Sequence, residues 1–99
     1  MKFPQIKQTG VEIVTSFHDN GQLGSRQFLF NGEYHRDPAD GPAYERWYVN
    51  GQLASRQFIL SGRLHRDPKD GPAYESWNGS GQLICRKFWV SGEEVKAPK

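Results

Sequence analysis

The sequence is short of several features, and each shortage narrows what the protein can be. Its single cysteine, Cys85, excludes an internal disulfide and a cysteine-rich zinc site. No run of about 18 apolar residues is present, so no membrane-spanning helix is expected. The formal net charge is only +2, with 13 basic and 11 acidic residues mixed along the chain. The one-sided basic patch typical of nucleic-acid binding is therefore missing, and a nucleic-acid partner is not expected.

Apolar residues are also scarce, since they make up 35% of the 99 residues and many of them are aromatic. This composition predicts one small domain with a thin core. The first ten residues, MKFPQIKQTG, contain no apolar run of the length that a signal peptide needs. We therefore expect a cytoplasmic location, in a bacterium or a phage-infected host cell.

What the sequence does contain is a 30-residue repeat. Residues 21–50 and 51–80 are identical at 19 of 30 positions, and a third copy begins at Gly81. Residues 11–20 resemble the end of an earlier copy, with Phe17 where Trp47 and Trp77 stand. Repetition at this period indicates an array of one supersecondary unit. The expected organisation is a single repeat domain over residues 1–99, with a partial unit 11–20, units 21–50, 51–80 and 81–95, and a basic tail 96–99.

At six positions, spaced alternately 11 and 19 residues apart, an Asn-Gly or Ser-Gly pair separates runs in which apolar and polar residues alternate. Asn-Gly between such runs is a strong hairpin signal, because both central residues of a type I′ turn need positive φ. The pattern predicts an all-β fold: an antiparallel meander of repeated hairpins, in a single-layer or curled sheet, without helices. The six pairs are Asn20-Gly21, Asn31-Gly32, Asn50-Gly51, Ser61-Gly62, Ser80-Gly81 and Ser91-Gly92.

Counting outward from each turn as a two-residue loop predicts a strand register. Opposite charges then face each other, and large rings face smaller side chains, as expected of a real pairing. The predicted pairs are Glu45 with Arg56, Trp47 with Ala54, Glu75 with Arg86, Trp77 with Ile84, Ala73 with Phe88 and Ile59 with Leu64. The aromatic residues that mark structural repeat positions are Trp47, Trp77, Phe28, Phe58 and Phe88.

This register places apolar and polar side chains on both faces of the sheet. Trp47, Glu45 and Phe58 share one face, and Tyr44 and Tyr48 share the other. A single layer cannot bury both faces by itself. We therefore expect the protein to associate with itself, as a homodimer, or with a protein partner.

The pattern of a Trp or Phe, then Asn-Gly-Gln-Leu or Ser-Gly-Gln-Leu, then a Phe and a second turn, and then HRDPxDGPAY resembles a MORN-variant repeat over residues 11–95. The resemblance implies a hairpin array that serves as an interaction scaffold. In some relatives such an array acts as a toxin-neutralising antitoxin or a phage protein, and in others it works near membranes. For this chain the resemblance implies a protein partner such as a bacterial toxin, an effector or a host defence protein.

No catalytic constellation is evident. The triplets at His35 and His65 share the letters HRD with the kinase catalytic loop, but no glycine-rich loop or metal-binding partner accompanies them. The protein is expected not to be an enzyme and to have no cofactor. We expect His35 and His65 to pack against Phe28 and Phe58, with the neighbouring arginines, Arg36 and Arg66, in solvent.

The pairs Asp37 with Asp40 and Asp67 with Asp70 offer only two carboxylates per loop, well short of the six to eight oxygens that calcium takes. Asx turns are the better interpretation, and no metal site is expected.

Candidate partner-binding residues come from the arginines and aromatics, the types that dominate interface energetics. Arg26 has Thr15 opposite it in the predicted register, whereas Arg56 and Arg86 face glutamates, so Arg26 is the arginine expected to be free. Trp89 differs from its repeat counterparts, Leu29 and Ile59. The full candidate set is Arg26, Trp89, Tyr44, Tyr74 and Tyr48.

Together these features predict a non-enzymatic protein-binding repeat module, most concretely a small inhibitor or antitoxin-like factor, including a phage-encoded anti-defence factor. One alternative is a structural or assembly protein of a phage or repeat array. A second alternative is a peripheral membrane-binding module, although the mixed charges disfavour a membrane partner.

Overall fold

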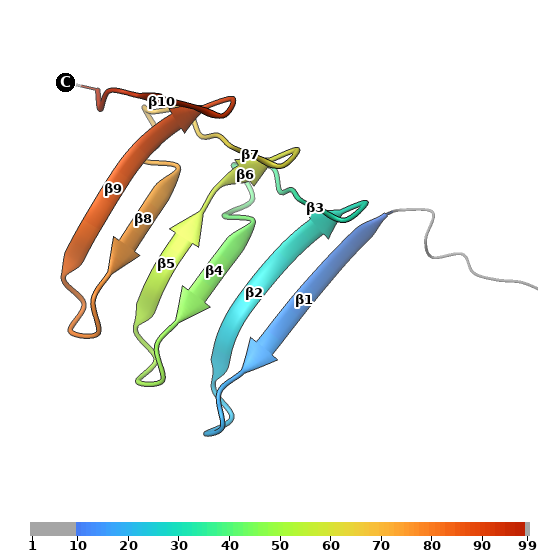
Figure 1. Cartoon of the computed structure of the whole chain (residues 1–99), viewed down its shortest axis with the longest axis vertical. Helices are drawn as coiled ribbons and strands as arrows, with labels where there is room; N and C mark the ends of the chain where they lie inside the picture. The colour runs from blue at the N-terminus through green and yellow to red at the C-terminus, as the bar shows by residue number, and fades with distance from the viewer. Residues whose placement is uncertain (1–9, 99) are drawn as a thin grey trace, which may run out of the picture.

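The computed structural model describes residues 10–98, and within this range the chain forms strands and turns and no helix (Figure 1). The predicted all-β class is therefore confirmed. The segment expected to lack a signal peptide falls almost wholly in residues 1–9, which lie outside the described residues, as does Lys99 at the end of the basic tail.

Ten strands follow one another within residues 10–98. They are β1 (Val11–Phe17), β2 (Leu23–Phe30), β3 (Glu33–Tyr34), β4 (Tyr44–Trp47), β5 (Leu53–Gln57), β6 (Ile59–Leu60), β7 (Arg63–Leu64), β8 (Tyr74–Trp77), β9 (Leu83–Val90) and β10 (Glu93–Val95).

The strands form an antiparallel meander in a single layer. The main sheet has the order β1-β2-β4-β5-β8-β9-β10, β3 pairs with the end of β2, and β6 and β7 form a separate two-stranded ribbon. Figure 1 shows the long strands side by side, with the short hairpins of β3, β7 and β10 gathered along one end of the sheet. The shortest dimension of the molecule is 17 Å, against 55 and 36 Å for the other two. Both faces of the sheet are therefore available to solvent or to a partner.

The six glycine turns belong to two types, and the sequence pattern does not separate them. Asn31, Ser61 and Ser91 have positive φ of 51–52°, and so do the glycines after them, as a two-residue type I′ turn requires. The other three turns differ. In the turn after β4, Tyr48 N–H donates to the Gln52 carbonyl at 2.9 Å and Gly51 N–H donates to the Tyr48 carbonyl at 2.9 Å.

These other turns are three-residue loops, in which only the last residue, a glycine, takes positive φ. The extra residue shifts the register at one point, so Trp47 lies opposite Leu53 and Trp77 opposite Leu83. The predicted pairs of Trp47 with Ala54 and Trp77 with Ile84 are therefore wrong. The pairs beyond the shift are confirmed: Glu45 with Arg56, Glu75 with Arg86, and Ile59 with Leu64 across the type I′ turn.

The two turn types make one prediction. Ser61→Asn is expected to raise the free energy of unfolding by about 0.5 kcal/mol, because asparagine tolerates positive φ better than serine. Ser80→Asn is the matched control, since residue 80 is also a Ser before a Gly but lacks positive φ. Chemical denaturation of both variants checks the difference, and equal gains would contradict the assignment of two turn types.

The core is thin and lies in the middle of the sheet. The buried apolar residues are Ala43, Ala54, Phe58, Ile59 and Ala73. Of the five aromatic repeat positions, only Phe58 is buried, with 3% of its surface exposed, while Trp47, Trp77, Phe28 and Phe88 are half-buried. Burial is therefore greatest in the middle of the sheet and falls toward both of its edges.

Candidate functional site

One face of the sheet, here called the arginine face, carries alternating arginines and glutamates across the strands. Arg26 on β2 donates to Glu45 Oε1 on β4 from Nε at 2.9 Å and from Nη2 at 2.6 Å. Arg56 Nε on β5 donates to Glu75 Oε1 on β8 at 2.7 Å, and Arg86 Nε lies 3.8 Å from Glu75 Oε2. Each arginine therefore binds a glutamate on the strand that follows it in the sheet, apart from Arg86, which reaches back to β8.

This pairing corrects the expectation that Arg26 is free. Thr15 does lie opposite Arg26 on β1, as predicted, but Glu45 on β4 lies on its other side and binds it. Counting outward from a hairpin turn identifies only one of the two strands that flank each strand. The second neighbour comes from a strand that pairs without a tight turn, so sequence reasoning missed it. The most exposed of the three side chains is Arg86, at 49%, against 37% for Arg26 and 34% for Arg56.

The same arginines lie beside aromatic rings. The Arg26 guanidinium carbon is 5.8 Å from the ring centre of Trp47 and 5.6 Å from that of Phe28. Thirty residues on, Arg56 stands 5.9 Å from Trp77 and 5.5 Å from Phe58. Cation–π contacts at this distance add a modest stabilisation to each row. The arginine face is thus largely occupied by its own internal contacts.

The arginine of the loop sequence HRDP, which occurs twice in the chain, has a structural role. Arg36 stacks on Phe28 with 3.9 Å between its guanidinium carbon and the ring centre, and it donates to the Pro42 carbonyl at 3.1 Å. Arg66 repeats the contact on Phe58 at 3.9 Å. Burial lowers the pKa of Arg66, and the nearby Arg56 charge lowers it further. The prediction that Arg36 and Arg66 lie in solvent is wrong, since both are half-buried.

The two histidines join neighbouring hairpins. His35 Nδ1 accepts a hydrogen bond from Ser61 N–H at 2.9 Å, and His65 Nδ1 accepts one from Ser91 N–H at 2.9 Å. The His35 ring lies 5.6 Å from that of Phe30. The Phe28 ring, the expected partner, carries Arg36, and His35 contacts Phe28 through its backbone N–H, which donates to the Phe28 carbonyl at 3.0 Å. Both histidines have a structural role at the ends of the hairpins.

The aspartates of the same loops form Asx turns, as the sequence indicated. Asp37 Oδ1 accepts from Ala39 N–H at 2.9 Å, and Asp67 Oδ1 accepts from Lys69 N–H at 3.0 Å. Among residues 10–98, no group of three or more histidine, cysteine or acidic side chains is placed to hold a metal ion.

Glu75 is the acidic side chain on which the arginine face depends most. Its side chain is 9% exposed and lies between Arg56 and Arg86. Glu75→Gln is expected to lower the free energy of unfolding by about 1–2 kcal/mol, because the charge-assisted bond to Arg56 is lost and two arginines then face each other. Glu45→Gln is the control, since Glu45 pairs with Arg26 alone among the described ion pairs. Thermal unfolding at low and high salt compares them, and an equal loss would contradict the bridging role of Glu75.

The opposite face, here called the tyrosine face, gathers four of the five candidate partner-binding residues. Strand alternation places Tyr44, Tyr48, Tyr74 and Trp89 on it, and all four are half-buried. Tyr34 joins them, with 37% of its surface exposed and its ring 5.8 Å from Tyr44. Sequence reasoning missed Tyr34, although its position two residues after a type I′ turn is a usable signal.

Within this face the candidates differ in how much they contribute to the fold. The Tyr48 hydroxyl donates to the Trp77 carbonyl at 2.8 Å, which ties one hairpin to the next. The Trp89 carbonyl accepts from Arg66 N–H at 3.0 Å, while its side chain shares the face with Glu94. The hydroxyl of Tyr48 is therefore used internally, and Tyr34, Tyr44 and Tyr74 are the better placed for an outside partner.

Two shallow grooves lie at the ends of the sheet. The first, of about 500 Å³, runs between β1 and the first HRDP loop and is lined by Val11, Ile13, Phe28, Leu29, Phe30, His35, Arg36, Asp37 and Asp40. It contains no serine, cysteine or lysine, and His35 Nδ1 is already bonded to the Ser61 backbone. Among the described residues, the lining of this groove combines apolar side chains of β1 and β2 with charged side chains of the loop.

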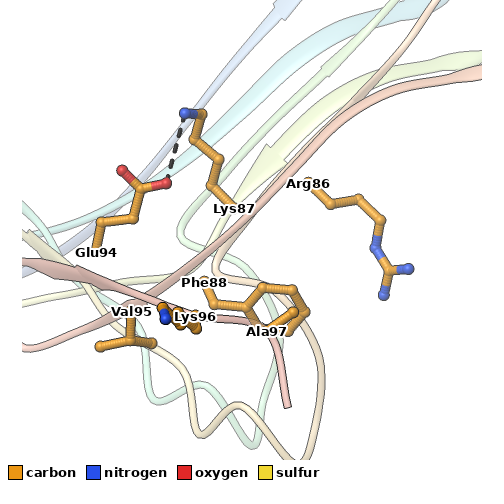
Figure 2. Close-up of a pocket in the computed structure, with 7 residues that line it drawn as sticks. All are labelled: Arg86, Lys87, Phe88, Glu94, Val95, Lys96 and Ala97. Atoms are coloured by element: carbon orange, nitrogen blue, oxygen red, sulfur yellow. Dashed lines mark hydrogen bonds and ion pairs between the residues drawn. The ribbon is translucent and has the colours of Figure 1, made fainter. Parts of the chain in front are cut away.

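The second groove, of about 450 Å³, lies at the other end of the sheet beside β9 and β10. Figure 2 shows Lys87 reaching toward Glu94, with 3.5 Å between Nζ and Oε2, while Arg86 extends away from that pair and the Phe88 ring lies beside Ala97. Both charged side chains of the pair are about half exposed. This end of the sheet is basic and open.

Neither a family model, nor a curated protein, nor a solved structure matches this chain. The described residues contain no helix that is long and apolar enough to cross a membrane.

Proposed function

We propose that the protein is a non-enzymatic protein-binding repeat module that docks on a partner protein through the tyrosine face. The most concrete form of this proposal is a small cytoplasmic inhibitor, antitoxin-like or phage-encoded, that blocks a bacterial toxin, effector or host defence protein. The resemblance to MORN-variant repeats motivates that form. The proposal includes a homodimer as the state of the free protein.

The observation that carries the proposal is the contrast between the two faces. On the arginine face, Arg26 and Arg56 are engaged in ion pairs with glutamates and in contacts with aromatic rings. The tyrosine face instead leaves Tyr34, Tyr44 and Tyr74 partly exposed on a sheet with no second layer among the described residues. Tyrosine provides a large contact area at a low cost in conformational entropy, which suits a binding surface.

The test is a comparison of two matched variants in a bacterial lysate. Tyr34→Ser combined with Tyr44→Ser removes the exposed ring pair of the tyrosine face, and Phe17→Ser removes an exposed ring, at 64%, from the other face. We expect wild type and Phe17→Ser to capture the same protein, and the double variant to lose it by at least tenfold. Circular dichroism and thermal unfolding confirm that each variant is folded.

A captured protein whose activity is inhibited on addition of the purified chain would support the inhibitor form. Equal capture by all three proteins would exclude the tyrosine face as the docking site. A protein that captures nothing but turns over a substrate would overturn the proposal as a whole.

A further inference from the structure

Strand β1 forms an edge of the sheet that is poorly protected against pairing with another strand. All seven of its residues are exposed, with exposed fractions of 57% at Ile13, 37% at Val14 and 64% at Phe17. In the part of the chain that the structure describes, no strand pairs with the outer side of β1. Its sequence, VEIVTSF, contains no lysine and no proline, the residues that usually block an exposed edge.

The opposite edge of the sheet is different. Strand β9 carries Arg86 and Lys87 at its open part, Lys96 follows β10, and β10 covers residues 88–90. Like charges on both strands would oppose pairing of this edge with itself. The two edges are therefore not equivalent, and β1 is the one suited to self-pairing.

The backbone groups that β1 presents outward follow from the ladder inside the sheet. Phe28 N–H donates to the Ala43 carbonyl at 2.8 Å, on the β4 side of β2. Strand alternation then directs Gln27 toward β1, where it lies opposite Val14. Val14 thus bonds inward, and the N–H and C=O groups of Ile13 and Thr15 point to the open side.

We propose that β1 pairs antiparallel with β1 of a second copy of this chain, across a two-fold axis through Val14. Ile13 then exchanges backbone hydrogen bonds with Thr15 of the second copy, and the two Val14 side chains meet in a non-hydrogen-bonded pair. Glu12 faces Ser16, so no like charges meet. This pairing is isologous and closes at two copies.

A head-to-tail pairing of β1 with β9 of a second copy fits less well. Within the sheet, β8 has the position that β1 of the second copy would take. This strand supplies Glu75, which lies between two arginines, and it follows Ala73, which is fully buried at 0% exposure. The equivalent residues of β1 are Thr15 and Ile13, sixty residues earlier in the sequence. Arg86 would gain no carboxylate, and the larger Ile13 would be forced into the space of an alanine.

This inference rests on the homodimer of the proposed function and names the surface that forms it. Capture of a different protein by the tyrosine face is measured separately, so that the two proposals fail independently.

Cysteine cross-linking tests the register. In a Cys85→Ser background, Val14→Cys is expected to form a disulfide-linked dimer under mild oxidation, because directly opposite residues in a non-hydrogen-bonded pair lie about 4.5 Å apart at Cα. Glu12→Cys in the same background is the control. It lies on the same face of the same strand but opposite Ser16, so it is expected to stay monomeric on a denaturing gel. Equal cross-linking at both positions, or cross-linking at residue 12 alone, would overturn the register.

Light scattering coupled to size exclusion tests the edge itself. Wild type is expected to elute at twice the 11.3 kDa of one chain. Thr15→Pro is expected to elute as a folded monomer, because the lost N–H points outward and the ladder with β2 is kept. If Thr15→Pro disturbs folding, Thr15→Lys provides the same block by charge. Arg86→Pro, at the opposite edge, is expected to remain a dimer.

A monomeric wild type at micromolar concentration would overturn the proposal, as would a Thr15→Lys variant that remains a dimer. Loss of association in both Thr15→Pro and Arg86→Pro would indicate the head-to-tail arrangement and also overturn it. A Thr15→Pro monomer that still captures the lysate protein would support the edge pairing and leave the tyrosine face as a separate docking site.

Discussion

Phe58→Ala is expected to lower the free energy of unfolding by about 3–5 kcal/mol, the largest effect of any single substitution considered for this chain. Among residues 10–98, Phe58 is the one aromatic ring that is buried, with 3% of its surface exposed. Arg66 stacks on it at 3.9 Å and Arg56 lies 5.5 Å from its centre. Its removal leaves a cavity in the middle of a thin core and also releases the arginine that organises the second HRDP loop.

The repeat supplies matched controls. Phe28→Ala and Phe88→Ala make the same change at positions thirty residues away, where the ring is only half-buried. Both are expected to lose clearly less stability than Phe58→Ala in urea unfolding monitored by tryptophan fluorescence. Phe58→Leu gives a measurable value if the alanine variant does not fold. Equal losses at all three positions would show that the central unit is no better packed than the outer ones.

Gly71→Ala is expected to lower the free energy of unfolding by about 2–3 kcal/mol. Gly71 has φ of +136°, a conformation that residues with a Cβ rarely adopt. An added Cβ would lie 2.6 Å from Arg66 Nη1, and Arg66 is held in place by the Phe58 ring and by the Pro72 carbonyl at 3.2 Å. The substitution therefore strains the backbone and displaces the arginine at once.

Gly79→Ala is the control, because its φ is not positive and no atom lies within 4 Å of the added Cβ. Its effect is expected to stay within about 0.5 kcal/mol. The double variant with Arg66→Ala separates the two causes: its loss should be smaller than the sum of the single losses, since the clash is gone. Strict additivity would mean that backbone strain alone accounts for the effect of Gly71→Ala.

Much of the architecture follows from local sequence. The glycine turns and the alternating runs between them were enough to predict an antiparallel hairpin meander without helices, because turn chemistry and period-two patterning act over a few residues. The pairs of Glu45 with Arg56 and Glu75 with Arg86 followed as well. The Asx turns at Asp37 and Asp67 are equally local, since each closes onto the backbone two residues ahead.

The features that depended on the tertiary structure all involve the strand that pairs with the second side of a given strand. Asn50-Gly51 and Ser61-Gly62 carry the same kind of signal, yet one ends a three-residue loop and the other is a two-residue turn. Arg26 was predicted to be free because its partner, Glu45, lies on β4, which is joined to β2 by a long connection. Arg36 was predicted to be solvated because the Phe28 ring on which it stacks lies on β2, outside the loop of Arg36. Local patterns specify the turns and the faces of each strand, but they do not specify which strand pairs with its other side. That long-range pairing produced the ion-pair rows, the buried Phe58 and the open edge at β1.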